Sequence, residues 1–221
     1  ANASVLAPDQ LAIVSARSGF FEPRSFKELY REVQICADFL KTKSISKNDH
    51  VLLAVKPGYQ LILIAFALFY LGAVPIIIDP GMGLKAFLKC IKNTKPTALI
   101  GISLIHVLSK FIPRPFRSIE KKVLIQSNHF SNEIKKGESN HTTLPTTTRP
   151  QDLAAIVFTS GSTGTPKGVC YSHQVFEAQI NHLQKDFGIE KGEKDLATLP
   201  IFALFNPALG VTSVIPDMNP R

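Results

Sequence analysis

Residues 154–171 read AAIVFTSGSTGTPKGVCY, and the rest of the chain can be interpreted from this stretch. Residues 154–158 form a short apolar run with β-branched side chains, which predicts one buried strand. The strand leads directly into residues 159–168, all of them hydroxyl residues, glycines or a proline except the single Lys167. Glycines allow backbone N–H groups to approach an anion closely, and turns can aim several N–H groups into one concavity. We therefore expect this loop to hold a polyphosphate.

Two other interpretations of the loop fit less well. A Gly/Ser/Thr run is often a flexible connector, but this one joins a buried strand to a second apolar piece at 169–171. A Walker A loop has the spacing G-x-x-x-x-G-K-[ST], with its lysine opening a helix. Lys167 instead lies between Pro166 and Gly168, and neither residue favours a helix interior. The Walker A assignment is therefore excluded.

Residues 158–169, FTSGSTGTPKGV, match the pattern [YF]-T-S-G-[ST]-T-G-x-P-K-G-V at every position. The stretch resembles the phosphate-binding signature of the adenylate-forming superfamily, which includes acyl- and aryl-CoA synthetases, peptide-synthetase adenylation domains and luciferases. The resemblance implies binding of the β- and γ-phosphates of ATP, together with Mg²⁺. It also implies that a small-molecule carboxylate attacks the α-phosphorus to give an acyl-adenylate and pyrophosphate. The implied nucleotide-binding residues are Thr159, Ser160, Gly161, Ser162, Thr163, Gly164, Thr165 and Lys167.

The composition is that of a folded chain without a disulfide or zinc framework. Of the 221 residues, 45% are hydrophobic and 19% charged, which allows a substantial core and excludes a disordered protein. Cys36, Cys90 and Cys170 are far apart and have no histidine cluster nearby, so no metal site is expected. The N-terminus lacks a charged segment followed by an apolar core, so no secretory signal is expected. These features favour a reducing, cytoplasmic setting.

The formal net charge is +8, and basic residues are concentrated in residues 110–136. A nucleic-acid surface would suit this charge, but no stacking aromatic residues or recognised motif accompany it. A solvated face that attracts anions mildly is the better interpretation, and no nucleic-acid partner is expected. The basic residues are Lys110, Arg114, Arg117, Lys121, Lys122, Lys135 and Lys136, against only Glu120 and Glu133.

Residues 61–78, LILIAFALFYLGAVPIII, carry no charge and approach the length of a membrane span. Gly72 is a natural helix stop, and Pro75 opens a β-branched run. The sequence therefore predicts a core helix to Leu71 and a strand over 74–78, with no membrane span. Before it, Ser25 and Glu28 form a capping box for an amphipathic helix, and 51–55 predicts a strand.

The later elements alternate between strand and helix. We expect helices over 84–93, 104–111 and 173–187, and strands over 97–100, 123–126, 195–199 and 212–215. Residues 137–151 are polar and predict a surface linker. This order predicts an α/β fold with a mainly parallel sheet flanked by helices through βαβ units. The superfamily resemblance implies the N-terminal portion of the large domain.

Residues 199–210, LPIFALFNPALG, resemble the aromatic motif that helps line the carboxylic-acid pocket in this superfamily. The resemblance implies that Phe202, Phe205 and Asn206 form the substrate pocket; the alternative is an ordinary hydrophobic helix start. Amino-acid-activating members usually place an aspartate where Asn206 stands, to pair with the substrate ammonium. An uncompensated ammonium would be costly there. A fatty or hydroxy-fatty acid is therefore the expected substrate.

ALFYLGAVPIIIDPGMG (67–83), LPIFALFNPALG and VIPDMNP (214–220) resemble the bacterial olefin β-lactone synthetases. These relatives activate a 2-alkyl-3-hydroxy fatty acid with ATP and close it to a β-lactone. Three acceptors of the acyl group are compatible with the sequence: coenzyme A, a carrier protein and an internal hydroxyl.

Later superfamily motifs are missing from the sequence, including the adenine-contacting Y-G-x-[TS]-E segment and the C-terminal lysine. We therefore expect residues 1–221 to form an incomplete N-terminal domain without the C-terminal domain, from an excised piece or a truncated gene product. Such a chain would lack turnover by itself, and its catalytic residues stay unassigned. The alternative is a non-catalytic module that binds nucleotide or phosphate.

Overall fold

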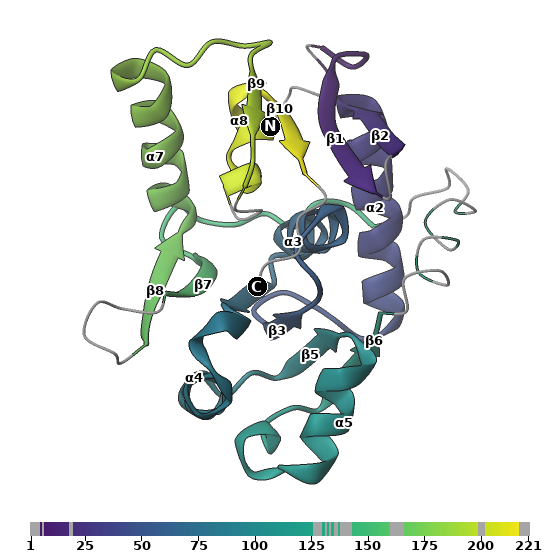
Figure 1. Cartoon of the computed structure of the whole chain (residues 1–221), viewed down its shortest axis with the longest axis vertical. Coiled ribbons are helices and arrows are strands. Elements are labelled where there is room, and N and C mark those ends of the chain that lie inside the picture. Colours follow the sequence, from purple (N-terminus) through teal and green to yellow (C-terminus); the bar gives the residue numbers. More distant parts are fainter. Residues whose placement is uncertain are drawn as a thin grey trace.

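The computed structural model describes residues 5, 7–17, 20–125, 130, 132, 134, 137, 143–159, 166–198 and 202–216. Within these residues the strands form two sheets, one of six strands and one of four. Figure 1 shows helices α2 (Phe26–Thr42) and α3 (Tyr59–Leu71) between the two sheets. The predicted α/β class is confirmed, but the structure has two sheets where the sequence predicted one.

The six-stranded sheet has the order β6-β5-β3-β4-β7-β8. Its first five strands are parallel, and β8 pairs antiparallel with β7 at the edge. The mainly parallel arrangement was predicted, whereas the antiparallel edge strand β8 was not. The strands are β3 (His50–Ala54), β4 (Val74–Ile78), β5 (Ala98–Gly101), β6 (Lys121–Leu124), β7 (Leu153–Thr159) and β8 (Lys167–Ser172).

Helices join the successive parallel strands of this sheet. The chain passes from β3 through α3 to β4, through α4 (Leu84–Thr94) to β5, and through α5 (Ser103–Phe111) to β6. Gly72 ends α3 in the left-handed conformation with φ of 67°, where L-residues with a side chain are strained. Short 3₁₀ helices lie at η1 (Pro80–Met82), η2 (Arg114–Phe116) and η3 (Phe202–Leu204). The βαβ units and the break at Gly72 were predicted.

The four-stranded sheet has the order β2-β1-β10-β9, and the sequence patterns did not predict its N-terminal hairpin. β1 pairs with β2 antiparallel and with β10 parallel, so that Ile13 lies opposite Ser213. The two ends of the described chain therefore meet in one sheet. The strands are β1 (Leu11–Arg17), β2 (Phe20–Ser25), β9 (Lys194–Leu196) and β10 (Thr212–Ile215).

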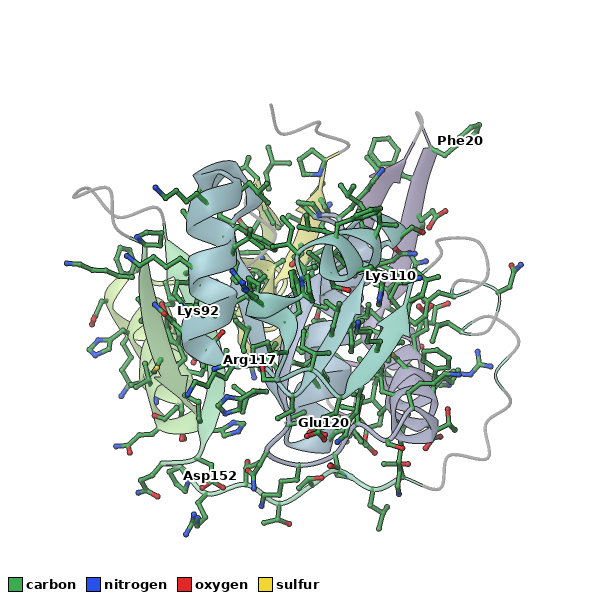
Figure 2. The ribbon with its side chains drawn as sticks, turned by 90° about the horizontal axis from the view of Figure 1, so that it is seen from below. Phe20, Lys92, Lys110, Arg117, Glu120 and Asp152 are labelled. Atoms are coloured by element: carbon green, nitrogen blue, oxygen red, sulfur yellow. The ribbon has the colours of Figure 1, made fainter. Side chains whose placement is uncertain are left out.

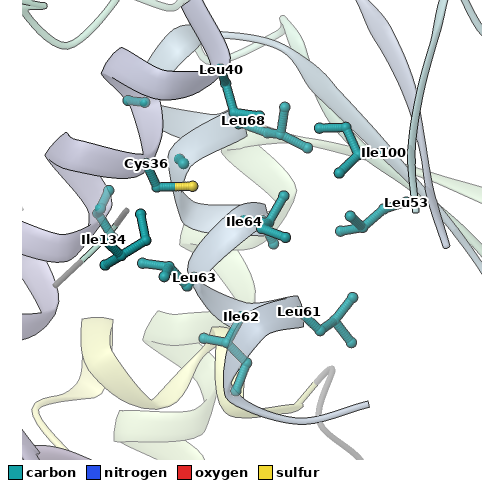
Figure 3. Packing of buried hydrophobic residues seen from close by; sticks show 14 of the residues in the cluster. Cys36, Leu40, Leu53, Leu61, Ile62, Leu63, Ile64, Leu68, Ile100 and Ile134 are labelled. Carbon is teal, nitrogen blue, oxygen red and sulfur yellow. The ribbon is translucent and has the colours of Figure 1, made fainter. Parts of the chain in front are cut away.

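The position of α3 between two sheets explains its sequence. A helix that is apolar on all sides must be buried on all sides, and Ile62, Ile64 and Leu68 are fully buried. Figure 3 shows Ile64 and Leu68 between strand residues such as Leu53 and the α2 residues Cys36 and Leu40. Among the described residues no helix is long and apolar enough to cross a bilayer. The prediction of a core helix rather than a span is thus confirmed.

The β3 strand separates two hydrophobic cores. Val51 and Leu53 face the cluster around α2 and α3, whereas Leu52 faces the cluster under α4 and α5. This alternation follows from the two-residue period of a strand. The sheet is therefore covered by helices on both faces, which fits its nearly continuous apolar strands.

Residues 137 and 143–151, the described part of the predicted linker over 137–151, contain no helix or strand. They are nevertheless bound to the body: the Tyr70 carbonyl accepts a hydrogen bond from the Thr146 N–H at 2.8 Å. The Tyr70 hydroxyl donates to the Thr143 carbonyl at 3.1 Å, and Lys47 Nζ donates to the Thr147 carbonyl at 2.9 Å. This segment carries the chain along the α2–α3 layer towards β7.

Candidate functional site

The predicted phosphate loop joins two strands of a hairpin. β7 and β8 pair so that Phe158 lies opposite Gly168 and Thr159 opposite Lys167. Lys167 is exposed and begins a strand rather than a helix, as expected from its proline and glycine neighbours. The other predicted loop residues, Ser160, Gly161, Ser162, Thr163, Gly164 and Thr165, lie outside the described residues. The structure thus brings the two stems of the loop together.

The hairpin stands at the carboxyl edge of the parallel strands. Ile78 of β4 lies opposite Phe158 of β7 in parallel register, so β4 and β7 end side by side. Ligands of open α/β sheets bind outside the carboxyl ends of the strands. The predicted loop therefore begins at the edge where a ligand site is expected.

Asp79 follows the last residue of β4 at this edge and is exposed. Its Oδ1 accepts a hydrogen bond from the Gly81 N–H at 2.8 Å, which holds the carboxylate in a tight turn. Because β4 and β7 end together, Asp79 and Thr159 both lie at the end of neighbouring strands. No functional role was predicted for Asp79, although its position directly after a buried strand is a signal for one.

Gly168 allows the two hairpin strands to pack closely. A Cβ at this position would lie 2.9 Å from Cζ and 3.0 Å from Cε1 of Phe158, which is tighter than real Cβ contacts. Phe158 is itself buried in the core under α4 and α5. The glycine that follows Lys167 thus sets the geometry of the loop stems through packing.

Phe176 lies at the centre of an aromatic cluster that connects the hairpin with the predicted acid pocket. It belongs to α7 (His173–Asp186), whose N-cap Ser172 accepts a hydrogen bond from the Val175 N–H. Its ring centroid is 5.1 Å from that of Tyr171 in β8, 5.2 Å from Phe205 and 5.8 Å from Phe69 of α3. All four rings are partly exposed. Phe176 of α7 thus links Phe205 to Tyr171 in the strand that follows the loop.

Of the other predicted pocket residues, Phe202 lies in η3, and Asn206 begins the short helix α8 (Asn206–Leu209). Asn206 is buried, and its Nδ2 donates to Asp195 Oδ2 at 2.8 Å and to Ser213 Oγ at 2.9 Å. These bonds use both amide hydrogens and fasten α8 to β9 and β10. The role of Asn206 in a substrate pocket stays a prediction. Both of its side-chain N–H groups already donate hydrogen bonds to Asp195 and Ser213.

His173 opens α7 close to the β7 strand. Burial lowers the pKa of His173, and the nearby Asp152 carboxylate opposes that shift. The His173 N–H donates to the Asp152 carbonyl at 3.1 Å, so the residue helps join α7 to the segment before β7. In the described part of the chain no group of three or more His, Cys, Asp or Glu side chains could hold a metal ion. The donor types at the hairpin, an ammonium and a hydroxyl- and glycine-rich loop, suit a phosphate chain rather than a protein-only metal site.

A family model for AMP-binding enzymes matches residues 2–215. The olefin beta-lactone synthetase of Stenotrophomonas maltophilia (strain K279a) is 37% identical over 226 residues, which cover 96% of this chain and 41% of the relative. The enzyme of the same name from Xanthomonas campestris pv. campestris is 36% identical and covered to 40% of its length. The chain thus spans about two fifths of the length of these relatives.

A similar fold occurs in a solved structure, the long-chain-fatty-acid–CoA ligase of Archaeoglobus fulgidus. The TM-score is 0.81 at 23% sequence identity, over 99% of this chain and 46% of the ligase. At this identity the likeness concerns the fold alone.

Proposed function

Because this chain belongs to the family of AMP-binding enzymes, we propose that it forms the phosphate- and acid-binding part of an ATP-dependent enzyme that activates a carboxylic acid. In this reaction the acid carboxylate attacks the α-phosphorus of ATP, which yields an acyl-adenylate and releases pyrophosphate. Mg²⁺, when bound with ATP, neutralises charge on the leaving pyrophosphate.

The observation that carries this proposal is the register of β7 and β8. It puts the exposed Lys167 opposite Thr159 at the carboxyl edge of the sheet, at the two stems of a hydroxyl- and glycine-rich loop. Backbone N–H groups from 160–165 and the Lys167 ammonium would hold the β- and γ-phosphates in this loop. Preorganised positive groups of this kind stabilise charge that develops in the transition state.

We further propose that the acid is a fatty or 3-hydroxy fatty acid. The partly exposed rings of Phe69, Tyr171, Phe176 and Phe205 offer an apolar surface next to the hairpin. Asn206 carries no charge that could pair with a substrate ammonium. The names of the two relatives support β-lactone closure as a later step. Coenzyme A and a carrier protein stay open as alternative acceptors, and the free thiols of Cys36, Cys90 and Cys170 support a cytoplasmic setting.

Calorimetric titration with MgATP tests the phosphate site. Charge-assisted hydrogen bonds contribute about 1.5–3 kcal/mol each, so Lys167→Ala should weaken MgATP binding by roughly tenfold or more. Gly164→Val should also weaken binding. Lys185→Ala, which removes an exposed lysine on α7, is the matched control and should bind as the unchanged chain does. Equal affinity in the Lys167 and Lys185 variants would show that the loop assignment is wrong.

Pyrophosphate–ATP exchange distinguishes the enzyme from a non-catalytic nucleotide-binding module. Both candidates would bind nucleotide through the loop between β7 and β8, so binding alone does not separate them. Such a module would bind MgATP but show no exchange with any fatty or 3-hydroxy fatty acid. Exchange that depends on the acid would instead support activation by this chain.

A further inference from the structure

Residues 83–125 carry an unusual share of the positive charge. This segment contains nine lysines and arginines and a single acidic residue, Glu120. Its formal net charge is therefore +8, which equals that of the whole chain. The remaining residues together are electrically neutral.

The helices of the charged segment cover one face of the six-stranded sheet. Ile91 of α4, Ile105 of α5 and Phe116 of η2 pack into the same core cluster, which also contains sheet residues such as Leu52 and Leu99. The inner sides of α4, α5 and η2 are thus buried against this face, and their other sides point outward. We call this outer surface, with the adjacent β6 strand, the α4–α5 face.

Eight of the nine basic residues of this segment are exposed. Lys85, Lys89 and Lys92 recur at helical spacing along the outer side of α4, and Lys110, Arg114 and Arg117 follow on α5 and η2. Figure 2 views the molecule from the α4 and α5 side and labels Lys92, Lys110 and Arg117 there. The ninth, Lys121, is paired with Asp49 at 2.7 Å. None of the eight exposed ones forms an ion pair with another described residue.

Large apolar side chains are exposed among these cations. Leu104, Val107 and Phe111 recur at three- and four-residue spacing on α5, with exposed fractions of 72%, 47% and 81%. Leu124 on β6 is 45% exposed and Leu84 at the start of α4 is 54% exposed. An apolar stripe of this kind, bordered by polar groups, marks an interaction surface.

We propose that the α4–α5 face docks on the surface of an anionic lipid bilayer. A helix that lies at such a surface buries an apolar stripe between headgroups and acyl chains, while lysines and arginines at its border contact the anionic headgroups. Phe111, Leu104 and Val107 would enter the headgroup layer. The long stems of the lysines would reach from the same depth to the phosphates. The bilayer is also where a long-chain acid partitions, although the docking does not depend on the proposed activity.

A nucleic acid fits this face less well. Surfaces that bind single strands combine cations with several aromatic side chains on which bases stack, and Phe111 is the one exposed aromatic residue among the described residues of the α4–α5 face. Leu104 and Val107 would gain little from a sugar–phosphate backbone. Lipid therefore accounts for both the charge and the apolar stripe.

Sedimentation of the full chain with vesicles tests the proposal. We expect binding to phosphatidylcholine vesicles that contain about one third phosphatidylglycerol, weaker binding as salt increases, and little binding to pure phosphatidylcholine. Equal binding to both kinds of vesicle, or no binding at low salt, would overturn the proposal. Displacement from vesicles by a short duplex DNA at matched phosphate concentration would favour nucleic acid and also overturn it.

Neutralising matched sets of lysines tests the contribution of charge. One lysine near an anionic surface contributes about fivefold in affinity, so K85Q/K89Q/K92Q should weaken vesicle binding roughly a hundredfold. K185Q/K191Q/K194Q removes the same charge from exposed positions on α7 and the segment to β9, and should lose much less. If the α4 variant fails to fold by circular dichroism, R114Q/R117Q on η2 replaces it. Equal losses in the two sets would mean that only total charge matters, which contradicts docking through this face.

Substituting one exposed phenylalanine tests the apolar contact. Phe111→Ser keeps every charge and should reduce binding to anionic vesicles by about tenfold or more, since a buried phenylalanine side chain is lost. Phe187→Ser is the matched control, because Phe187 is 76% exposed at the end of α7. It should bind as the unchanged chain does. A Phe111 variant that binds like the Phe187 variant would refute insertion of the α5 stripe.

Discussion

Asn206 illustrates how a residue can be buried for reasons that its own sequence neighbourhood does not show. Its partners Asp195 and Ser213 lie on β9 and β10, on either side of α8 in the sequence. A buried amide needs hydrogen-bond partners, and these two supply them. The sequence places Asn206 in a motif but does not reveal its partners, because they belong to other elements, 11 residues before it and 7 residues after it.

The Asn206–Asp195 contact predicts the effect of exchanging the two residues. Asn206→Asp would set a second carboxylate at the position of Nδ2, 2.8 Å from Asp195 Oδ2, and should destabilise the protein by about 2–4 kcal/mol at pH 7. The double variant D195N/N206D restores one amide and one carboxylate and should recover most of this loss. Urea denaturation at pH 7 measures both. A double variant no more stable than N206D would contradict the hydrogen-bond assignment.

Gly168 gives a second prediction at the scale of a single residue. Gly168→Ala adds a Cβ within 3 Å of the Phe158 ring, so the ring must move, and we expect a loss of about 1–3 kcal/mol in the free energy of unfolding. The control is the same substitution in a Phe158→Leu background. There the smaller side chain leaves room, and the added cost of the alanine should fall. Equal costs in both backgrounds would show that the ring contact does not limit residue 168.

At the scale of the element, we expect the buried helix α3 to contribute strongly to the free energy of unfolding, because it packs between the two sheets. Ile64 is fully buried in the layer between them, so Ile64→Ala should cost about 2–5 kcal/mol. Leu104→Ala removes an exposed side chain from α5 and should change stability by less than about 0.5 kcal/mol. Chemical denaturation compares the two. Similar costs would indicate that α3 is not the packed centre of the molecule.

Elements whose sequence carries a local signal were predictable. The capping box of Ser25 and Glu28 marked the start of α2, Gly72 marked the end of α3, and Ser172 marked the start of α7. β1 and β2 carried no comparable signal, and the pairing of β1 with β10 depends on residues about 200 positions away. β8 was also missed as a strand, since four of its six residues are exposed. The composition of the sequence identified the two ends of the loop. It did not predict that β7 and β8 pair antiparallel with Thr159 opposite Lys167.

At the scale of the whole molecule, Asp49 ties three strands of the large sheet together. Asp49 precedes β3, and its carboxylate accepts hydrogen bonds from Thr97 just before β5 at 2.9 Å and from Lys121 in β6 at 2.7 Å. The Ser46 N–H also donates to it at 2.7 Å. Burial alone would raise the pKa of Asp49, but these hydrogen bonds outweigh it and lower the pKa below its ordinary value. The charged carboxylate therefore stabilises the folded state.

This arrangement predicts how stability depends on pH. Because the folded-state pKa of Asp49 is lowered, its stabilisation is complete above the unfolded value of about 3.9 and is lost as the pH falls through the folded value. Asp49→Asn should cost about 2–4 kcal/mol at pH 7, and the difference from the unchanged chain should shrink below about pH 4. Urea denaturation at pH 7, 5 and 3 measures this. Asp9→Asn, at an exposed position, is the control. A difference that does not change with pH would contradict the role of the charge.

The parallel pairing of β1 with β10 has a consequence for how the protein is made. Ile13 leaves the ribosome some two hundred residues before Ser213, its neighbour in the sheet. The β1–β2 hairpin must therefore wait with one strand edge open while most of the chain is translated. Contacts of such long sequence separation form slowly. A chaperone that shields residues 11–25 during synthesis should thus raise the yield of native protein more than one that acts on the released chain.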